Sequence, residues 1–126
     1  MIPASETGDR PRLLVVEDDP DLRDALSDAL SASGYSVDCA VNGREALDYL
    51  EITPPPCLVL LDLMMPVMNG WEFRAEQVRN EKIASIPVVL LTAETRADLG
   101  VTLGADECLT KPIELGKLLA VIARYH

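Results

Sequence analysis

The run of apolar residues 57–61, Cys-Leu-Val-Leu-Leu, restricts the fold of this chain more than any other segment. Its side chains do not alternate between apolar and polar, which predicts a strand buried on both faces rather than one with a solvated face. Such strands occur in parallel sheets that helices cover on both sides. The run ends at Asp62, and Pro66 together with Asn69-Gly70 indicates a loop directly after it.

The remainder of the chain alternates strand patterns with helix patterns. Asp19-Pro20 predicts the start of the first helix, with the aspartate as its cap, and Asn42-Gly43 opens the second. A weaker fourth helix is expected at 95–103, with Gly100 inside it. Five strands alternating with five helices predict an α/β fold, a five-stranded parallel sheet in the flavodoxin-like order 2-1-3-4-5 with helices on both faces. The expected strands are 13–16, 35–40, 57–61, 88–91 and 107–110.

Polar side chains stand at the carboxyl ends of four of these strands: Glu17 and Asp18 at the first, Asp62 at the third, Thr92 at the fourth and Lys111 at the fifth. The first and third strands are neighbours at the switch point of this strand order, so their carboxylates are expected to converge within a few ångströms. Without a counter-charge, such carboxylates repel one another and raise at least one pKa. A hard divalent cation relieves that repulsion, and Mg²⁺ suits a site of few carboxylates and several waters.

The hydroxyl of Thr92 and the ammonium group of Lys111 approach the same site and suit an anion. A carboxylate nucleophile, a metal, a lysine and a hydroxyl are the parts that phosphoryl transfer needs, because that reaction depends on charge neutralisation and positioning. The residues at the strand ends therefore predict phosphoryl chemistry.

Composition and charge exclude several classes of protein. The 126 residues predict one domain, and the formal net charge of -10 argues against a nucleic-acid-binding surface. Cys39, Cys57 and Cys108 lack CxxC spacing and lie in apolar runs, so they are expected to be buried free thiols in a reducing compartment. Residues 1–11 predict a flexible leader before a domain at 12–126, and no segment has the pattern of a signal peptide or a membrane span. We therefore expect a cytoplasmic protein without membrane insertion.

The polar strand ends also carry a family resemblance. The motif set of response-regulator receiver domains is similar to residues 15–19 (Val-Val-Glu-Asp-Asp), 62–66 (Asp-Leu-Met-Met-Pro) with Gly70, Thr92-Ala93, and 104–106 (Gly-Ala-Asp) with Lys111-Pro112. The resemblance implies a CheY-like fold of two-component signal transduction. Such a domain accepts a phosphoryl group from a histidine kinase or a phosphotransfer protein, uses Mg²⁺, and switches the binding of a downstream protein partner. It is a signalling phosphoacceptor rather than an enzyme, although it catalyses its own phosphoryl transfer and slow aspartyl-phosphate hydrolysis, and it does not contact nucleic acid directly.

The resemblance further implies a role for each acid at this edge of the sheet. Asp62 would be the phosphoacceptor, Asp18 would bind Mg²⁺ directly, and Glu17 would do so largely through water. Met64 would contribute only its backbone carbonyl to the metal. Asp19 is assigned to helix capping, and the choice of Glu17 and Asp18 over Asp18 and Asp19 depends on a difference of one residue in where the first strand stops.

On the other side of the site, Thr92 would contact the phosphoryl group, Lys111 would pair with it, and the Lys111-Pro112 peptide bond would be cis. Two features depart from the family pattern. Cys108 stands where an aromatic residue is usual, and the interval from Thr92 to Lys111 is about one helical turn shorter than usual. The phosphorylated state is therefore expected to be communicated through residues 93–103, with little reorientation at Cys108.

Two other functions remain open. A pseudo-receiver would bind partners without phosphorylation, which the two departures permit but the presence of Asp62, Thr92 and Lys111 argues against. An aspartate-nucleophile phosphatase would need a second acid two residues after Asp62, and Met64 occupies that position.

Overall fold

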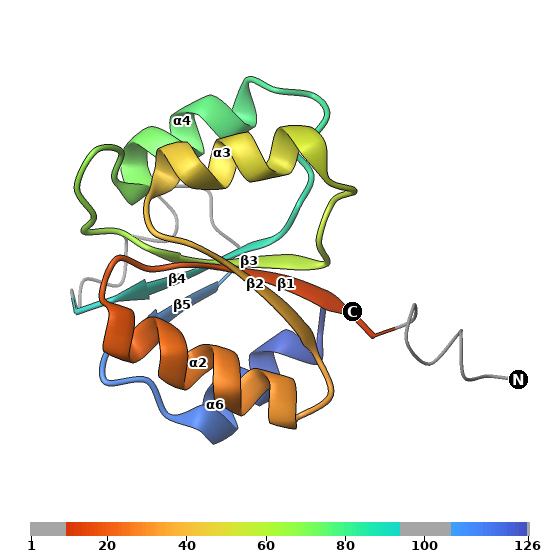
Figure 1. Ribbon diagram of the computed structural model, residues 1–126, viewed down its shortest axis with the longest axis vertical. Helices are drawn as coiled ribbons and strands as arrows, with labels where there is room; N and C mark the ends of the chain where they lie inside the picture. The colour runs from red at the N-terminus through yellow and green to blue at the C-terminus, as the bar shows by residue number, and fades with distance from the viewer. Residues whose placement is uncertain (1–9, 94–106, 126) are drawn as a thin grey trace, which may run out of the picture.

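A parallel sheet in the order β2-β1-β3-β4-β5 forms the middle layer of the molecule (Figure 1). The computed structural model describes residues 10–93 and 107–125. All five residues of β3 and all five of β4 are buried, as are four of the five residues of β1. The strand order and the parallel pairing confirm the predicted sheet. The strands are β1 (Arg12–Val16), β2 (Ser36–Ala40), β3 (Leu58–Asp62), β4 (Val88–Thr92) and β5 (Glu107–Thr110).

Helices cover both faces of this sheet, two on each face within the described residues (Figure 1). Alternate side chains of β1 divide between two apolar cores: Leu14 and Val16 face α3 and α4, whereas Leu13 and Val15 face α2 and α6. This division explains why the central strands are apolar at each position between their polar ends, at 13–16, 58–61 and 88–91. The fourth helix predicted at 95–103 lies outside the described residues. The helices are α2 (Pro20–Ala32), α3 (Gly43–Ile52), α4 (Gly70–Val78) and α6 (Leu115–Ile122).

Side-chain caps begin three of the helices. The Asp19 carboxylate accepts a hydrogen bond from the amide of Asp21, which confirms the predicted cap of α2. Asn42 caps α3, which begins where Asn42-Gly43 predicted a helix start. Asn69 and Glu72 form a reciprocal capping box at the start of α4. Each cap lies at the carboxyl edge of the sheet, so the caps also fix the loops around that edge.

The predicted burial of the cysteines is wrong for Cys39 and Cys108, which are exposed, whereas Cys57 is partly buried. Cys39 lies on β2 and Cys108 on β5, the two edge strands of the sheet. An edge strand pairs with a neighbour on one side only, so its side chains are less enclosed than those of a central strand. An apolar run on an edge strand therefore does not require burial.

The buried side of α4 is partly polar. Arg74 and Gln77 are buried there, while the apolar residue Val78 is exposed. The Gln77 amide donates to the carbonyl oxygens of Ile83 and Ile86 at 3.0 and 3.1 Å, and its oxygen accepts from Arg74 at 2.6 Å. These bonds hold the turns between α4 and β4, so a buried network replaces part of the usual apolar stripe.

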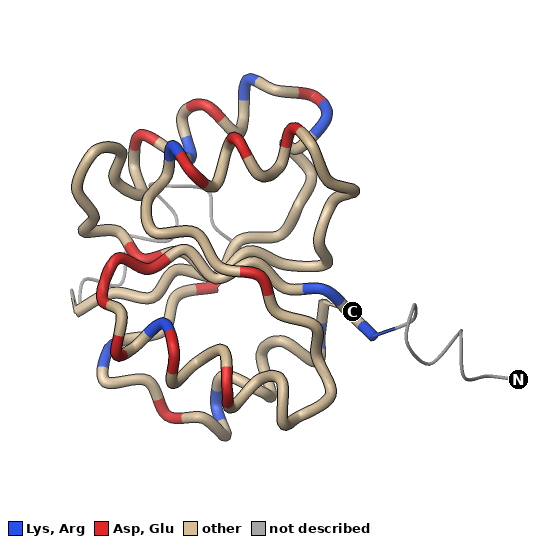
Figure 2. Tube along the Cα trace, viewed as in Figure 1, with Lys and Arg blue, Asp and Glu red and all other residues tan. Residues whose placement is uncertain are grey.

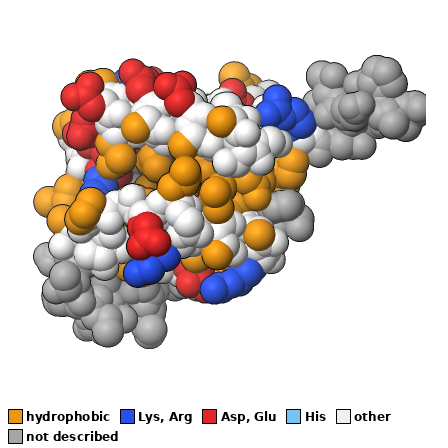
Figure 3. Space-filling model, turned by 90° about the horizontal axis from the view of Figure 1, so that it is seen from below, with side chains coloured by type: hydrophobic (Ala, Val, Ile, Leu, Met, Phe, Trp, Pro, Cys, Tyr) orange, Lys and Arg blue, Asp and Glu red, His pale blue; other side chains and the backbone are white. Residues whose placement is uncertain are grey.

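On the opposite face, α2 and α6 leave apolar side chains at the surface between them. Figure 3, which views the molecule from the side of these helices, shows apolar side chains in a band across this face, with acidic side chains above the band and both acidic and basic side chains below it. Leu22, Ile113 and Leu119 are only partly buried against the core on this side.

Candidate functional site

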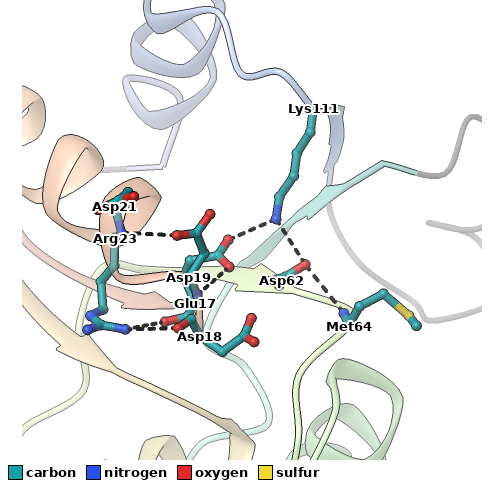
Figure 4. A network of polar contacts seen from close by, with 8 residues as sticks. All are labelled: Glu17, Asp18, Asp19, Asp21, Arg23, Asp62, Met64 and Lys111. Carbon is teal, nitrogen blue, oxygen red and sulfur yellow. Dashed lines mark hydrogen bonds and ion pairs between the residues drawn. The ribbon is translucent and has the colours of Figure 1, made fainter.

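Three acids converge at the carboxyl edge of the sheet, as predicted. Val16 of β1 pairs with Leu61 of β3, so the residues that follow, Glu17 and Asp62, stand side by side. Ligand atoms of Glu17, Asp18 and Asp62, hereafter the acidic triad, lie within 4.8 Å of one another. Figure 2 shows acidic residues gathered at this edge, and Figure 4 shows the triad side chains turned toward one another.

Lys111, at the end of β5, reaches into the triad. Its Nζ lies 2.9 Å from Glu17 Oε1 and 3.3 Å from Asp62 Oδ1 (Figure 4). The ammonium group of Lys111 is therefore a partial counter-charge for the triad. The repulsion expected from the sequence was that among the carboxylates without this partner. Among the described residues, Lys111 is the side chain that forms ion pairs with the triad, so three carboxylates share one paired ammonium group. The Lys111-Pro112 peptide bond is cis, as the family resemblance implied.

Burial and neighbouring charges raise the pKa values of two groups in this cluster, Glu17 and Lys111. Burial raises the pKa of Glu17 to about 7, with the negative charge of Asp62 in support and hydrogen bonds from Lys111 and the Asp19 amide opposing it. Burial works against the charged form of Lys111, but its hydrogen bond to Glu17 and the charge of Asp62 outweigh burial and raise its pKa.

Because of Glu17, the free energy of unfolding of the metal-free protein should depend on pH. Its pKa is higher in the folded protein than the ordinary 4.5, so the unfolded chain ionises first. The contribution of neutral Glu17 to stability is complete below pH 4.5 and is lost as the pH rises to about 7, a loss on the order of 3 kcal/mol. Urea unfolding in EDTA from pH 4.5 to 7.5, with Glu17→Gln as the reference, measures it. Parallel pH curves for the two proteins would exclude this effect.

Thr92 ends β4 next to the triad. It is 1% exposed, its strand neighbour β3 ends at Asp62, and its carbonyl oxygen accepts from the Lys111 amide at 2.7 Å. The structure thus brings the predicted hydroxyl residue and the predicted lysine to adjacent positions. Their contacts with a phosphoryl group stay predictions.

The loop from β3 to α4 closes tightly behind Asp62. A Cβ at Gly70 would lie 2.8 Å from the Leu63 Cα and 2.9 Å from the Asp62 carbonyl oxygen, so glycine is required there. Met64 is exposed, and its amide donates to Asp62 Oδ1 at 3.3 Å. This bond holds the predicted acceptor carboxylate, and the role of the Met64 carbonyl toward a metal stays a prediction.

Val67 in this loop has a φ of 67°, a left-handed backbone that is costly for a β-branched residue. Its side chain is 78% exposed, so it gains little from packing. Val67→Asn should therefore raise the free energy of unfolding by about 1 kcal/mol, since asparagine tolerates this conformation. Chemical denaturation measures the change, and Val78→Asn on the exposed side of α4 serves as control. Equal or opposite effects of the two substitutions would show that Val67 is not strained.

Arg23 of α2 was not singled out from the sequence, yet it borders the site. Its Nη1 donates to the carbonyl oxygen of Glu17 at 3.0 Å and, more weakly, to that of Asp18 at 3.4 Å (Figure 4). The sequence did offer one signal for this contact: Arg23 lies early in a helix that begins just after Glu17 and Asp18. The chemistry of the acids resides in their side chains, whereas Arg23 contacts their backbone.

The chain belongs to the response regulator receiver domain family, which it matches over residues 13–123. It is a receiver domain of the kind found in two-component response regulators, with a CheY-like fold. It is 43% identical over 114 residues to the transcriptional regulatory protein CpxR homolog of Haemophilus influenzae, covering 88% of this chain and 48% of that protein. It is 38% identical over 120 residues to the alkaline phosphatase synthesis transcriptional regulatory protein SphR of Synechococcus elongatus, covering 86% and 46%. The chain thus spans about half the length of the curated relatives it matches.

Solved structures of similar fold include the chemotaxis response regulator CheY4 of Vibrio cholerae, with a TM-score of 0.84, 31% identity and coverage of 93% of this chain and 99% of that one. The response regulator TrrA of Thermotoga maritima, in complex with Mg(2+)-BeF, has a TM-score of 0.79 and 33% identity, with coverage of 92% and 99%. The receiver domain of the Pseudomonas aeruginosa sensor histidine kinase PA1611 has a magnesium ion coordinated in its active site cleft, with 25% identity, a TM-score of 0.84 and coverage of 92% and 97%.

Within the described part of this chain, no helix has the length and apolar character of a membrane span.

Proposed function

We propose that this domain accepts a phosphoryl group on Asp62 from a phosphohistidine of a histidine kinase or phosphotransfer protein, and that the modification switches the binding of a protein partner. One observation carries the proposal most: the Nζ atom of Lys111 lies within 3.3 Å of Asp62 and 2.9 Å of Glu17. A cation that already borders the acceptor oxygen is placed to pair with a phosphoryl group attached there.

The acidic triad fits Mg²⁺ by its donor chemistry. All three side chains offer carboxylate oxygens, which are the ligands of a hard divalent cation, and no sulfur or imidazole ligand belongs to this cluster of described residues. Asp18 would bind the ion directly, Glu17 largely through water, and Asp62 and the Met64 carbonyl would complete the protein's share. When bound, the ion supplies positive charge to the phosphoryl oxygens as they become more negative.

In this reaction a carboxylate oxygen of Asp62 attacks phosphorus while the bond from phosphorus to the donor imidazole breaks, and the imidazole takes the electron pair and a proton. Lys111 pairs with the transferred group, and Thr92 donates its hydroxyl to a phosphoryl oxygen. The chain needs no general base, because Asp62 reacts as an anion. Later attack of water on the aspartyl phosphate regenerates the carboxylate slowly, so the domain acts as a signalling phosphoacceptor.

Incubation of the protein with acetyl phosphate tests this function. Intact-mass measurement should show one added phosphate in the presence of Mg²⁺ and none in EDTA. Failure to label with Mg²⁺ present would instead favour a pseudo-receiver that binds its partners without phosphorylation. The expected readout segment, residues 93–103, lies mostly outside the described residues, so its role stays a prediction.

A further inference from the structure

Asp18 differs from the other members of the acidic triad in how its carboxylate is held. Glu17 Oε1 accepts from Lys111 at 2.9 Å and its Oε2 from the Asp19 amide at 3.2 Å. Asp62 Oδ1 is bonded by the Met64 amide and lies near Lys111. Among residues 10–93 and 107–125, no hydrogen bond or ion pair orients the Asp18 carboxylate, although it converges with the other two. Its position therefore depends on its backbone.

That backbone is held from outside the strand. β1 ends at Val16, so the carbonyl groups of Glu17 and Asp18 lie beyond the regular pairing of the sheet. Arg23 Nη1 donates to both, at 3.0 and 3.4 Å, and Figure 4 shows its guanidinium on the backbone side of the two acids, away from their carboxylates.

The position of Arg23 in α2 is electrostatically unfavourable by itself. It lies four residues after the cap Asp19, and a cation near a helix N-terminus opposes the helix dipole. The guanidinium does not use this position to pair with the triad carboxylates. Instead it is half-buried against the two carbonyl groups, an arrangement that fixes the turn of chain carrying Asp18.

We propose that Arg23 is a positioning residue for divalent-cation binding: by clamping the carbonyl groups of Glu17 and Asp18, it holds in the acidic triad the Asp18 carboxylate, to which no described residue forms a hydrogen bond or ion pair. This inference rests on the proposed metal site. It assigns to α2 a part in the site that goes beyond the charge of the triad itself.

Charge and positioning predict opposite effects of removing Arg23, which makes the inference testable. Loss of a positive charge close to a cation site should by itself tighten Mg²⁺ binding. Loss of the clamp should weaken binding, because Asp18 would have to be ordered by the metal. Arg23→Met is therefore expected to raise the dissociation constant of Mg²⁺ about fivefold, the cost of one to two net hydrogen bonds.

The experiment is isothermal titration of the EDTA-treated, dialysed protein with MgCl₂. Arg23→Lys keeps the positive charge and one donor nitrogen, so its dissociation constant for Mg²⁺ should lie between those of the parent and Arg23→Met. A merely structural role of Arg23 would not give this graded series. Arg79→Met, at the end of α4 in an exposed ion pair with Glu76, is the charge-matched control and should bind like the parent. Circular dichroism melts in EDTA establish that each variant is folded, and Arg23→Gln replaces Arg23→Met if the latter is not.

Equal or tighter Mg²⁺ binding by Arg23→Met, with normal binding by the parent, would overturn the positioning role and leave the proposed function intact. A parent protein that binds no Mg²⁺ would overturn both. Mg²⁺ binding that is weakest in Arg23→Met, intermediate in Arg23→Lys and tightest in the parent supports the positioning role of Arg23.

Discussion

Asp62→Asn is expected to abolish phosphorylation by acetyl phosphate, lowering the labelled fraction by at least about 100-fold. Asparagine keeps the size of the side chain at the end of β3 but lacks the anionic oxygen that attacks phosphorus. The change also removes one of the two carboxylates that contact Lys111. Intact-mass analysis after incubation with Mg²⁺ and acetyl phosphate measures the labelled fraction.

Asp48→Asn on the exposed side of α3 is the matched control, since it removes the same charge far from the acidic triad. It should be labelled like the parent protein. Equal labelling of Asp62→Asn and the parent would remove Asp62 from the role of acceptor.

Asp18→Asn is expected to raise the dissociation constant of Mg²⁺ at least about tenfold while leaving the metal-free protein as stable as the parent or more stable. The carboxylate adds repulsion to the triad, and no described residue bonds it in compensation. Titration with Mg²⁺ measures the first effect, and thermal melts in EDTA measure the second. Asp24→Asn, an exposed acid of α2, controls for net charge. Marked destabilisation by Asp18→Asn in EDTA would show that this acid is structural.

The sheet could be predicted from the sequence because β3 and β4 are each apolar at four successive positions and then end at a polar residue, Asp62 or Thr92. The convergence of Glu17, Asp18 and Asp62 followed from strand order, since the carboxyl ends of neighbouring parallel strands meet at one edge. Helix starts were predictable where a cap residue precedes the helix, as at Asp19 and Asn42.

Contacts that depend on side-chain reach could not be predicted in this way. Neither the link from Lys111 to Glu17, across 94 residues of chain, nor the clamp of Arg23 on two carbonyl groups has a periodic pattern. The buried polar face of α4 was also missed, because Gln77 satisfies carbonyl groups of a turn that only the folded chain brings near. The exposure of Cys39 and Cys108 depends on which strands lie at the edges.

Chemical mapping of the phosphorylated residue tests the central claim most directly. Borohydride reduces an acyl phosphate to an alcohol and so converts the acceptor aspartate to homoserine. Peptide mass mapping after treatment with Mg²⁺, acetyl phosphate and borohydride should find this conversion at Asp62 alone, and only in the sample with Mg²⁺. Reduction of Glu17, Asp18 or another acid to its alcohol, or homoserine at position 62 that still forms in EDTA, would contradict the assignment of Asp62 as the metal-dependent phosphoacceptor.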